Sequence, residues 1–312
     1  MTAPTWLDEL ALEPGPPWLA MGTRGLGDQP WLLVDHDRDR DLAWKAALLA
    51  ERHHEVFAAL DTREVQAASD ETLHLVRLHA AVPSNHHANR GVMIAGTSDH
   101  HTPVAGGTGG QVGADAGALD GLHPLDAAGR LVQEDLCLLV LRDGAPHLDA
   151  ASLCFPSYWR LADKLGRPMA EVHGPVAHYA EELAARVDAF LARLRPDRPV
   201  WRRNWSIHDD PTYFLPIDPG GSGQEASPSD APCPEPPEGL WLRSERQTLR
   251  RLTAADAVLF TIRTQQVPLG LLAERPDLAR RMAAAVDAWS PELRAYKGGH
   301  GALAAVPWLA SR

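Results

Sequence analysis

Residues 136–155 read LCLLVLRDGAPHLDAASLCF, and this stretch decides the expected fold class. The apolar run at 136–141 predicts a buried strand, and Asp143-Gly144 is a turn signal. A second strand is predicted over 148–155, so the two segments are expected to form a β-hairpin.

The segments after this hairpin complete an α+β pattern. Their periodicity predicts helices over 157–165, 179–194 and 276–289, and strands over 200–207, 240–249 and 258–263. The central order is β-β-α-α-β-β-β, which suits one five-stranded antiparallel sheet. Two helices would cross between the second and third strands.

The remaining chain divides by composition. Helices are expected over 41–60 and 72–82, after an arm rich in Pro and Trp. A Gly-rich stretch with paired histidines reads as an insertion, and an acidic, Pro-rich stretch reads as a solvated loop. The expected parts are an N-terminal arm with helices (1–83), the insertion (84–127), a core (128–270) containing the loop (218–239), and a C-terminal helix and tail (271–312).

Composition excludes several function classes. The 312 residues carry a formal net charge of -11, which argues against binding to nucleic acid or an anionic membrane. Every apolar run is shorter than the ~20 residues of a membrane span, and the first residues do not resemble a secretory signal. The 3 cysteines lack a CxxC spacing, which fits a reducing, cytoplasmic compartment. The chain shows no FMN, NAD or iron–sulfur motif.

Two of the expected strands place polar residues in rows. Alternation puts Arg202, Asn204, Ser206 and His208 on one face of the strand at 200–207. In the strand at 240–249, one face carries Arg243, Glu245 and Gln247, and the other carries Arg246. Such rows form either a solvated outer face with cross-strand ion pairs or the wall of a polar pocket. The spacing alone leaves both readings open.

A single histidine, His173 in EVHGPV, lies between the two central helices. A tetrahedral zinc site has little support there, because a second ligand at a suitable spacing is missing. A haem needs only one proximal ligand and an apolar slot.

Several motifs, taken in order, resemble the haem-dependent oxidative N-demethylase family, specifically its haem-binding alpha subunit. They are QEDLCLL at 133–139, FPSYWRLADKLGRPMAEVHGPV at 155–176, RRNWSI at 202–207, RSERQTLRRL at 243–252 and LFTIRTQQVPL at 259–269. The resemblance implies a PAS-like fold that binds haem b, with the five-stranded sheet as its core. It implies His173 as the axial ligand of the haem iron, with His208 as runner-up and His178 third.

The resemblance also implies a reaction. A small secondary or tertiary alkylamine would be N-demethylated with O2, releasing formaldehyde, with electrons from a separate flavin/iron–sulfur reductase chain. A cationic amine needs a carboxylate, for which Glu245 is the first choice and Glu134 and Asp135 are alternatives. The groups expected to bind the cofactor, the arginines through haem propionates, are Arg202, Arg203, Arg243, Arg246 and Asn204.

The sequence departs from the family pattern at two places. PVA at 175–177 replaces PVP, and TQQVPL at 264–269 lacks the aromatic residue expected after Thr264. Such a change could alter the substrate or remove catalysis. The alternative function is therefore a non-catalytic PAS-like sensor or carrier that binds haem or another small ligand.

Overall fold

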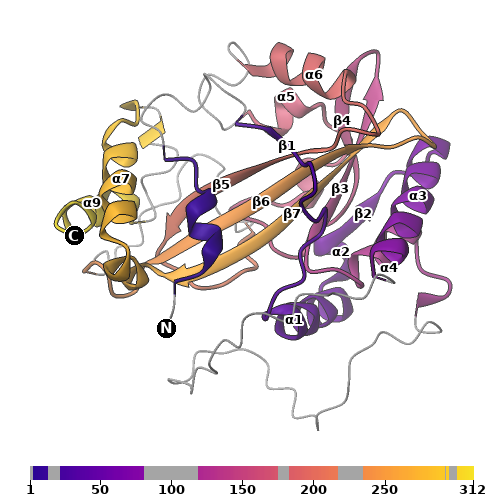
Figure 1. Ribbon diagram of the computed structural model, residues 1–312. Helices are drawn as coiled ribbons and strands as arrows, with labels where there is room; N and C mark the ends of the chain where they lie inside the picture. The colour runs from indigo at the N-terminus through magenta and orange to yellow at the C-terminus, as the bar shows by residue number, and fades with distance from the viewer. Residues whose placement is uncertain are drawn as a thin grey trace, which may run out of the picture.

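The computed structural model describes residues 3–12, 22–80, 119–174, 183–216, 235–291, 293–294 and 301–312. Its centre is a single antiparallel sheet flanked by helices on both faces (Figure 1). The strands, in sheet order, are β1 (Arg24–Gly25), β5 (Val200–His208), β6 (Trp241–Arg251), β7 (Ala257–Pro268), β3 (Asp135–Arg142), β4 (Ala145–Ser152) and β2 (Phe57–Ala59).

The mixed α+β class is confirmed, but the sheet has seven strands where the sequence predicts five. The two extra strands belong to the N-terminal part of the chain and extend the sheet at both edges. β1 pairs with β5 through Arg24 and Trp201, and β2 pairs with β4 through Phe57 and Ser152. Strands of two and three residues are too short to show an alternating pattern, so the sequence could not reveal them.

Helices lie before, between and after the strands along the chain. They are η1 (Thr5–Glu9), α1 (Arg38–Glu51), α2 (His53–Val56), α3 (Arg63–Ala80), α4 (Pro124–Gly129), η3 (Leu161–Asp163), α5 (Met169–Val172), α6 (Ala184–Ala192), η5 (Leu269–Glu274), α7 (Pro276–Asp287) and α9 (Ala302–Ala310). The helix predicted over 157–165 is wrong, since only the short 3₁₀ turn η3 forms there. Within the described residues, every helix is too short or too polar to span a bilayer.

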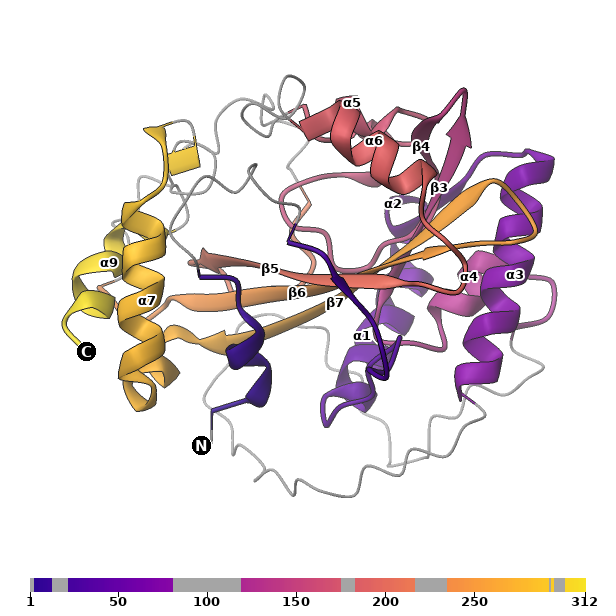
Figure 2. The same ribbon diagram turned by 45° about the horizontal axis from the view of Figure 1, so that its top comes forward.

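The two faces of the sheet pack against different helices (Figure 2). We call one the α6 face; its apolar part packs against α5 and α6 and comprises Cys137, Leu139, Leu249, Phe260 and Ile262. We call the other the α3 face; its apolar part packs against α3 and α4 and comprises Leu136, Leu138, Val140, Trp201 and Leu259. Further along the α3 face, Trp205, Ile207 and Leu242 pack against η1, α7 and α9.

The boundaries predicted from composition can be followed only in part. Most of the expected 84–127 insertion and of the 218–239 loop lies outside the described residues. The last residues of the expected insertion begin α4, whose Leu125 and Ala128 are fully buried in the α3-face core. The helix predicted over 276–289 corresponds to α7.

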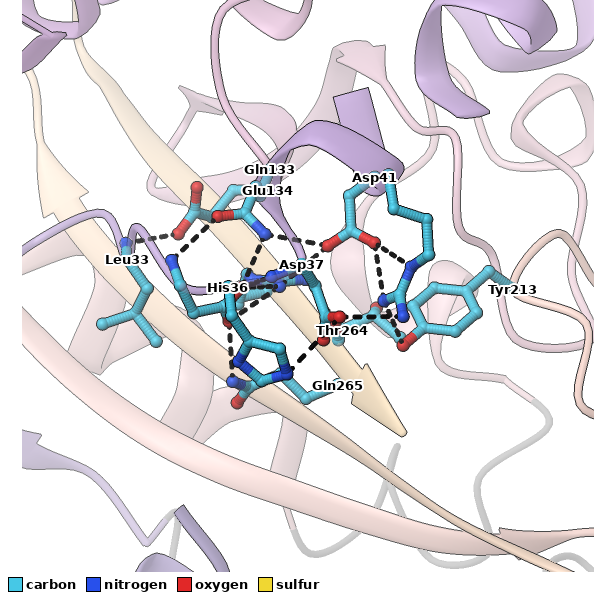
Figure 3. Close-up of polar contacts among 12 residues, drawn as sticks. Leu33, His36, Asp37, Asp41, Gln133, Glu134, Tyr213, Thr264 and Gln265 are labelled. Atoms are coloured by element: carbon cyan, nitrogen blue, oxygen red, sulfur yellow. Dashed lines mark hydrogen bonds and ion pairs between the residues drawn. The ribbon is translucent and has the colours of Figure 1, made fainter. Parts of the chain in front are cut away.

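A buried ion-pair network attaches the segment before α1 to the α3 face (Figure 3). The guanidinium of Arg263 on β7 is 1% exposed and lies 2.8 Å from Asp35 Oδ2 and 2.8 Å from Asp41 Oδ2. Gln133 donates to Asp41 at 2.8 Å and to Asp35 at 2.9 Å. These contacts join residues almost 230 positions apart.

We expect Arg263→Met to destabilise the fold strongly. Removing one partner of a buried pair leaves Asp41 with less compensation for its lost hydration, which costs about 3–5 kcal/mol in comparable sites. Urea unfolding followed by circular dichroism would measure the difference. Arg195→Met is the matched control, because its pair with Asp197 is more than half exposed and should contribute little. Equal effects of the two substitutions would contradict a structural role for Arg263.

Candidate functional site

Register brings the polar rows of two strands onto the same face of the sheet. Arg202 lies opposite Gln247, Asn204 opposite Glu245, and Ser206 opposite Arg243. β7 continues the rows on the α6 face with Thr264 and Gln266. We call this set the polar strip; its members are Arg202, Asn204, Ser206, His208, Arg243, Glu245, Gln247, Thr264 and Gln266.

Burial decides between the two readings of these rows. The side chain of Arg243 is 1% exposed and that of Glu245 is 17% exposed, and the remaining members are half-buried or buried. A solvated outer face would leave such long polar side chains in water. The polar strip is therefore an interior wall.

A line of polar contacts holds the carboxylate of Glu245 in place. Arg202 Nε donates to Gln247 Oε1 at 2.9 Å, and Gln247 Nε2 donates to Glu245 Oε2 at 3.0 Å. Arg243 Nε lies 3.8 Å from Glu245 Oε1, beyond hydrogen-bond length. Glu245 is thus a fixed anion with a cationic neighbour, and one of its oxygens lacks a close hydrogen bond from Arg243.

Arg243 is occupied mainly by the backbone of two loops. Its Nη1 donates to the carbonyl of Tyr213 at 3.1 Å, and its Nη2 donates to the carbonyl of Phe155 at 2.7 Å. Burial lowers the pKa of this guanidinium, and the nearby Glu245 acts against that shift. Two of its three nitrogens therefore have structural partners, so Arg243 cannot bind a propionate through two nitrogens and only its Nε is left to donate.

His173 follows α5 directly, and its ring has a defined tautomer. Nδ1 lies 3.0 Å from the carbonyl oxygen of Met169. A carbonyl can only accept, so Nδ1 carries the proton and the lone pair of the neutral ring is on Nε2. Burial, together with the charges of Lys164 and Arg202, lowers the pKa of His173 to about 4, against the opposing effect of the contact with Met169. An imidazole that is neutral at pH 7 and anchored through Nδ1–H to a carbonyl has the preparation typical of a metal ligand.

His208, the other candidate ligand, has both ring nitrogens in hydrogen bonds. Nε2 lies 2.6 Å from Ser206 Oγ, and Nδ1 lies 3.2 Å from the hydroxyl of Tyr158. Its ring also stacks on that of Tyr158 with 5.2 Å between centroids. An iron bond would have to replace one of these contacts. His178 lies outside the described residues.

Several predicted site residues lie away from His173 and the polar strip. Glu134 accepts from the backbone N–H of Leu33 at 2.7 Å and belongs to the α3-face network (Figure 3). Arg246, on the same face, donates to the carbonyls of Pro30 and Trp31. Arg203 is also on that face and pairs with Glu9 at 2.6 Å.

Asp135 is fully buried and holds two backbone N–H groups of the segment after β4. Its two oxygens accept from the backbone N–H groups of Cys154 and Phe155, each at 2.8 Å, and Lys45 Nζ lies 3.8 Å away. Burial raises the pKa of Asp135, while Lys45 and the two N–H groups lower it. These contacts give Asp135 a structural role at the start of β3, outside the polar strip.

Two residues of the polar strip, Thr264 and Gln266, are missing from the polar rows predicted from the sequence. Thr264 and Gln266 follow Phe260 and Ile262 at every second position of β7, so strand alternation alone could have placed them on this face. Their side chains are unusual. The Thr264 hydroxyl and both polar atoms of the Gln266 amide are buried without a hydrogen-bond partner in the part of the chain that the structure describes.

Such orphaned atoms are costly unless something binds them. Arg243 Nε, on the neighbouring strand, is a further buried atom of this kind. The polar strip therefore offers unused donors beside the carboxylate of Glu245, on the same side of the sheet as His173. These groups fit a bound cofactor together with a small polar ligand.

A comparison with protein-family models matches residues 22–306 of this chain to the description "haem-dependent oxidative N-demethylase, alpha subunit-like". The chain belongs to this family. The match covers His173, the whole polar strip and the three strands that carry it. The resemblance expected from the short motifs is thereby confirmed. The family name indicates an oxidative enzyme with haem-dependent N-demethylase activity.

We expect the titration of His173 to leave a signature in the stability of this N-demethylase family member. Its pKa is about 4 in the folded protein and near 6.5 in the unfolded chain. Between these values the unfolded state binds more protons, so the free energy of unfolding should rise as the pH rises from about 4 to 6.5.

In a His173→Gln variant this part of the slope should disappear, as measured by urea unfolding of the haem-free protein at several pH values. His74→Gln, on the exposed surface of α3, is the control and should keep the slope. An unchanged slope in His173→Gln would show that His173 titrates normally.

Proposed function

We propose that this chain is the haem-binding subunit of an amine N-demethylase, with haem b on the α6 face between His173 and the polar strip. The observation that carries the proposal is the state of His173, which is neutral at pH 7, half-buried and oriented through Met169. The family match supports haem dependence. The free buried thiols of Cys137 and Cys154 support a cytoplasmic location.

The residues of the site receive distinct roles. His173 Nε2 would be the axial ligand of the iron, and Arg202 is the guanidinium whose charge acts on His173, so it is our choice for a haem propionate. Asn204, opposite Glu245, would face the bound ligand. Arg203, Arg243 and Arg246 are left out, because backbone carbonyls, Glu9 or the far side of the sheet occupy them.

The central strands support a PAS-like core. Without the two short edge strands, the order is β5-β6-β7-β3-β4, and the helices between β4 and β5 cross the α6 face. We propose that this five-stranded part is the cofactor-binding unit, and that β1 and β2 are additions to it.

The proposed reaction converts a secondary or tertiary alkylamine, O2, two electrons and two protons into the demethylated amine, formaldehyde and water. Bound haem would supply the activation of oxygen. The electrons would come from a separate flavin/iron–sulfur reductase chain. Glu245 would bind the alkylammonium group and fix the position of its N-methyl carbon, because an anion held by Gln247 cannot turn away from the ligand.

Purified protein should contain haem, with a Soret band at about 400 nm. His173→Ala should remove stoichiometric haem, because Nε2 is the only protein bond assigned to the iron. His74→Ala, on the surface of α3, should keep it. Full haem content with an unchanged spectrum in His173→Ala would refute this ligand assignment.

Loaded protein with a chemical or protein reductant should release formaldehyde from methylated amines. Haem binding without formaldehyde from any methylated amine would favour the non-catalytic sensor or carrier. Protein that takes up no haem would refute both functions.

Glu245→Gln should weaken amine binding while haem content stays constant. The substitution keeps the shape and removes the charge, and a charge-assisted hydrogen bond is worth about 1.5–3 kcal/mol, or roughly 10- to 150-fold in affinity. Spectral titration of the haem-loaded protein with dimethylamine measures the dissociation constant. Glu134→Gln is a matched control on the α3 face and should leave that constant unchanged. A loss of haem in Glu245→Gln would instead assign Glu245 to the cofactor.

A further inference from the structure

Four residues of the polar strip form a compact block on two neighbouring strands. Glu245 lies directly opposite Thr264, and Arg243 lies directly opposite Gln266. Directly opposed residues have Cβ atoms about 4.5–5.5 Å apart, and diagonal neighbours are about 7–8 Å apart. These separations are within the span of a ligand of a few atoms.

The block offers an uneven set of hydrogen-bonding groups. The orphaned donors are Arg243 Nε–H, the Gln266 amide NH₂ and the Thr264 hydroxyl. The only strong orphaned acceptor is Gln266 Oε1, since the Thr264 hydroxyl can also donate. Glu245 adds a carboxylate at the adjacent corner. Glu245 thus suits a cationic group of the ligand. The side chains of Arg243, Thr264 and Gln266 suit a ligand group that accepts several hydrogen bonds.

A simple dialkylamine would satisfy only part of this block. Dimethylamine brings one ammonium group, which Glu245 can bind, and its two methyl groups would leave three polar side chains buried without partners. Leaving a buried polar group unpaired costs about 1–3 kcal/mol, so such a ligand would gain little from this wall.

We propose that the amine bound here carries a carboxylate one carbon from its nitrogen, as in an N-methylated α-amino acid. Its ammonium group would pair with Glu245, and its carboxylate would accept from Gln266, Thr264 and Arg243 Nε. The positive charge of Arg243 offsets the repulsion between this carboxylate and Glu245. This inference rests on the proposed function, because it names the substrate class of that same site.

The test is a calorimetric titration of the oxidised, haem-loaded protein without reductant. The ligands are N-methylglycine, dimethylamine and N-ethylmethylamine, the last of which matches the chain length of N-methylglycine without its carboxylate. N-methylglycine should bind at least about 10-fold more tightly than either amine, as expected for hydrogen bonds to a charged group. Equal or weaker binding of N-methylglycine in the wild-type protein would overturn the inference.

Two substitutions locate the effect. Gln266→Met and Thr264→Val keep side-chain size and remove the donors, so each should weaken N-methylglycine about 10-fold or more and change dimethylamine less than about 2-fold. Gln66→Met, on the exposed surface of α3, is the control for the loss of an amide. Loss of haem in Gln266→Met would assign this amide to the cofactor and overturn the inference. An equal loss for both ligands would overturn it as well.

The binding titration needs no turnover, so the two proposals can fail separately. Preferred binding of N-methylglycine without formaldehyde release from any amine would contradict the proposed function and still support an N-methylated α-amino acid as the ligand of this site. Formaldehyde release from dimethylamine without preferred N-methylglycine binding would support the function and refute the substrate class.

Discussion

Register between β5, β6 and β7 is the constraint on which the site depends. A strand residue can face only one side of its sheet, and a shift by one position would turn every side chain to the other side. The observed pairing of Asn204 with Glu245, and of Glu245 with Thr264, puts three polar rows on the α6 face. Apolar residues of the same strands, such as Leu242 and Val267, then face η1, α7 and α9. The C-terminal helices thus help to maintain the register that builds the site.

The two faces of the sheet treat buried polar groups differently. On the α3 face, the ion pairs of Arg263 with Asp35 and Asp41 attach the N-terminal segment to β7, although Arg263 Nε and Glu134 Oε2 are buried without a partner among the described residues. On the α6 face, the side chains of Thr264 and Gln266 are left without partners among the described residues. The first pattern is that of a structural network, because its charges compensate one another internally. In the second, uncharged side chains without partners lie beside the carboxylate of Glu245, which is why we propose a ligand there.

The two histidines show how environment separates candidates that a sequence treats alike. His173 and His208 both lie near the ends of elements beside the α6 face. His173 is anchored through one nitrogen to a backbone carbonyl, while His208 bridges a serine and a tyrosine through both. The contact with Met169 fixes the tautomer of His173, and this is the reason for proposing its Nε2 as the ligand atom. His173 contacts Met169, and His208 contacts Ser206 and Tyr158. Tyr158 lies outside the strand that carries His208, so the sequence of that strand could not show this contact.

The sequence alone determined the α+β class, the five long strands and the rows on β5 and β6, because periodicity and alternation are local properties of the chain. Its ordered motifs also identified the family. Only the tertiary structure decided that the rows form an interior wall, since burial depends on segments far away in the sequence. It also placed Glu134 and Arg246 on the α3 face, away from the polar strip, where the N-terminal segment supplies their partners at Leu33 and Pro30. The strands β1 and β2 are too short to show an alternating pattern in the sequence. They are recognised only by their pairing with β5 and β4, which the tertiary structure supplies.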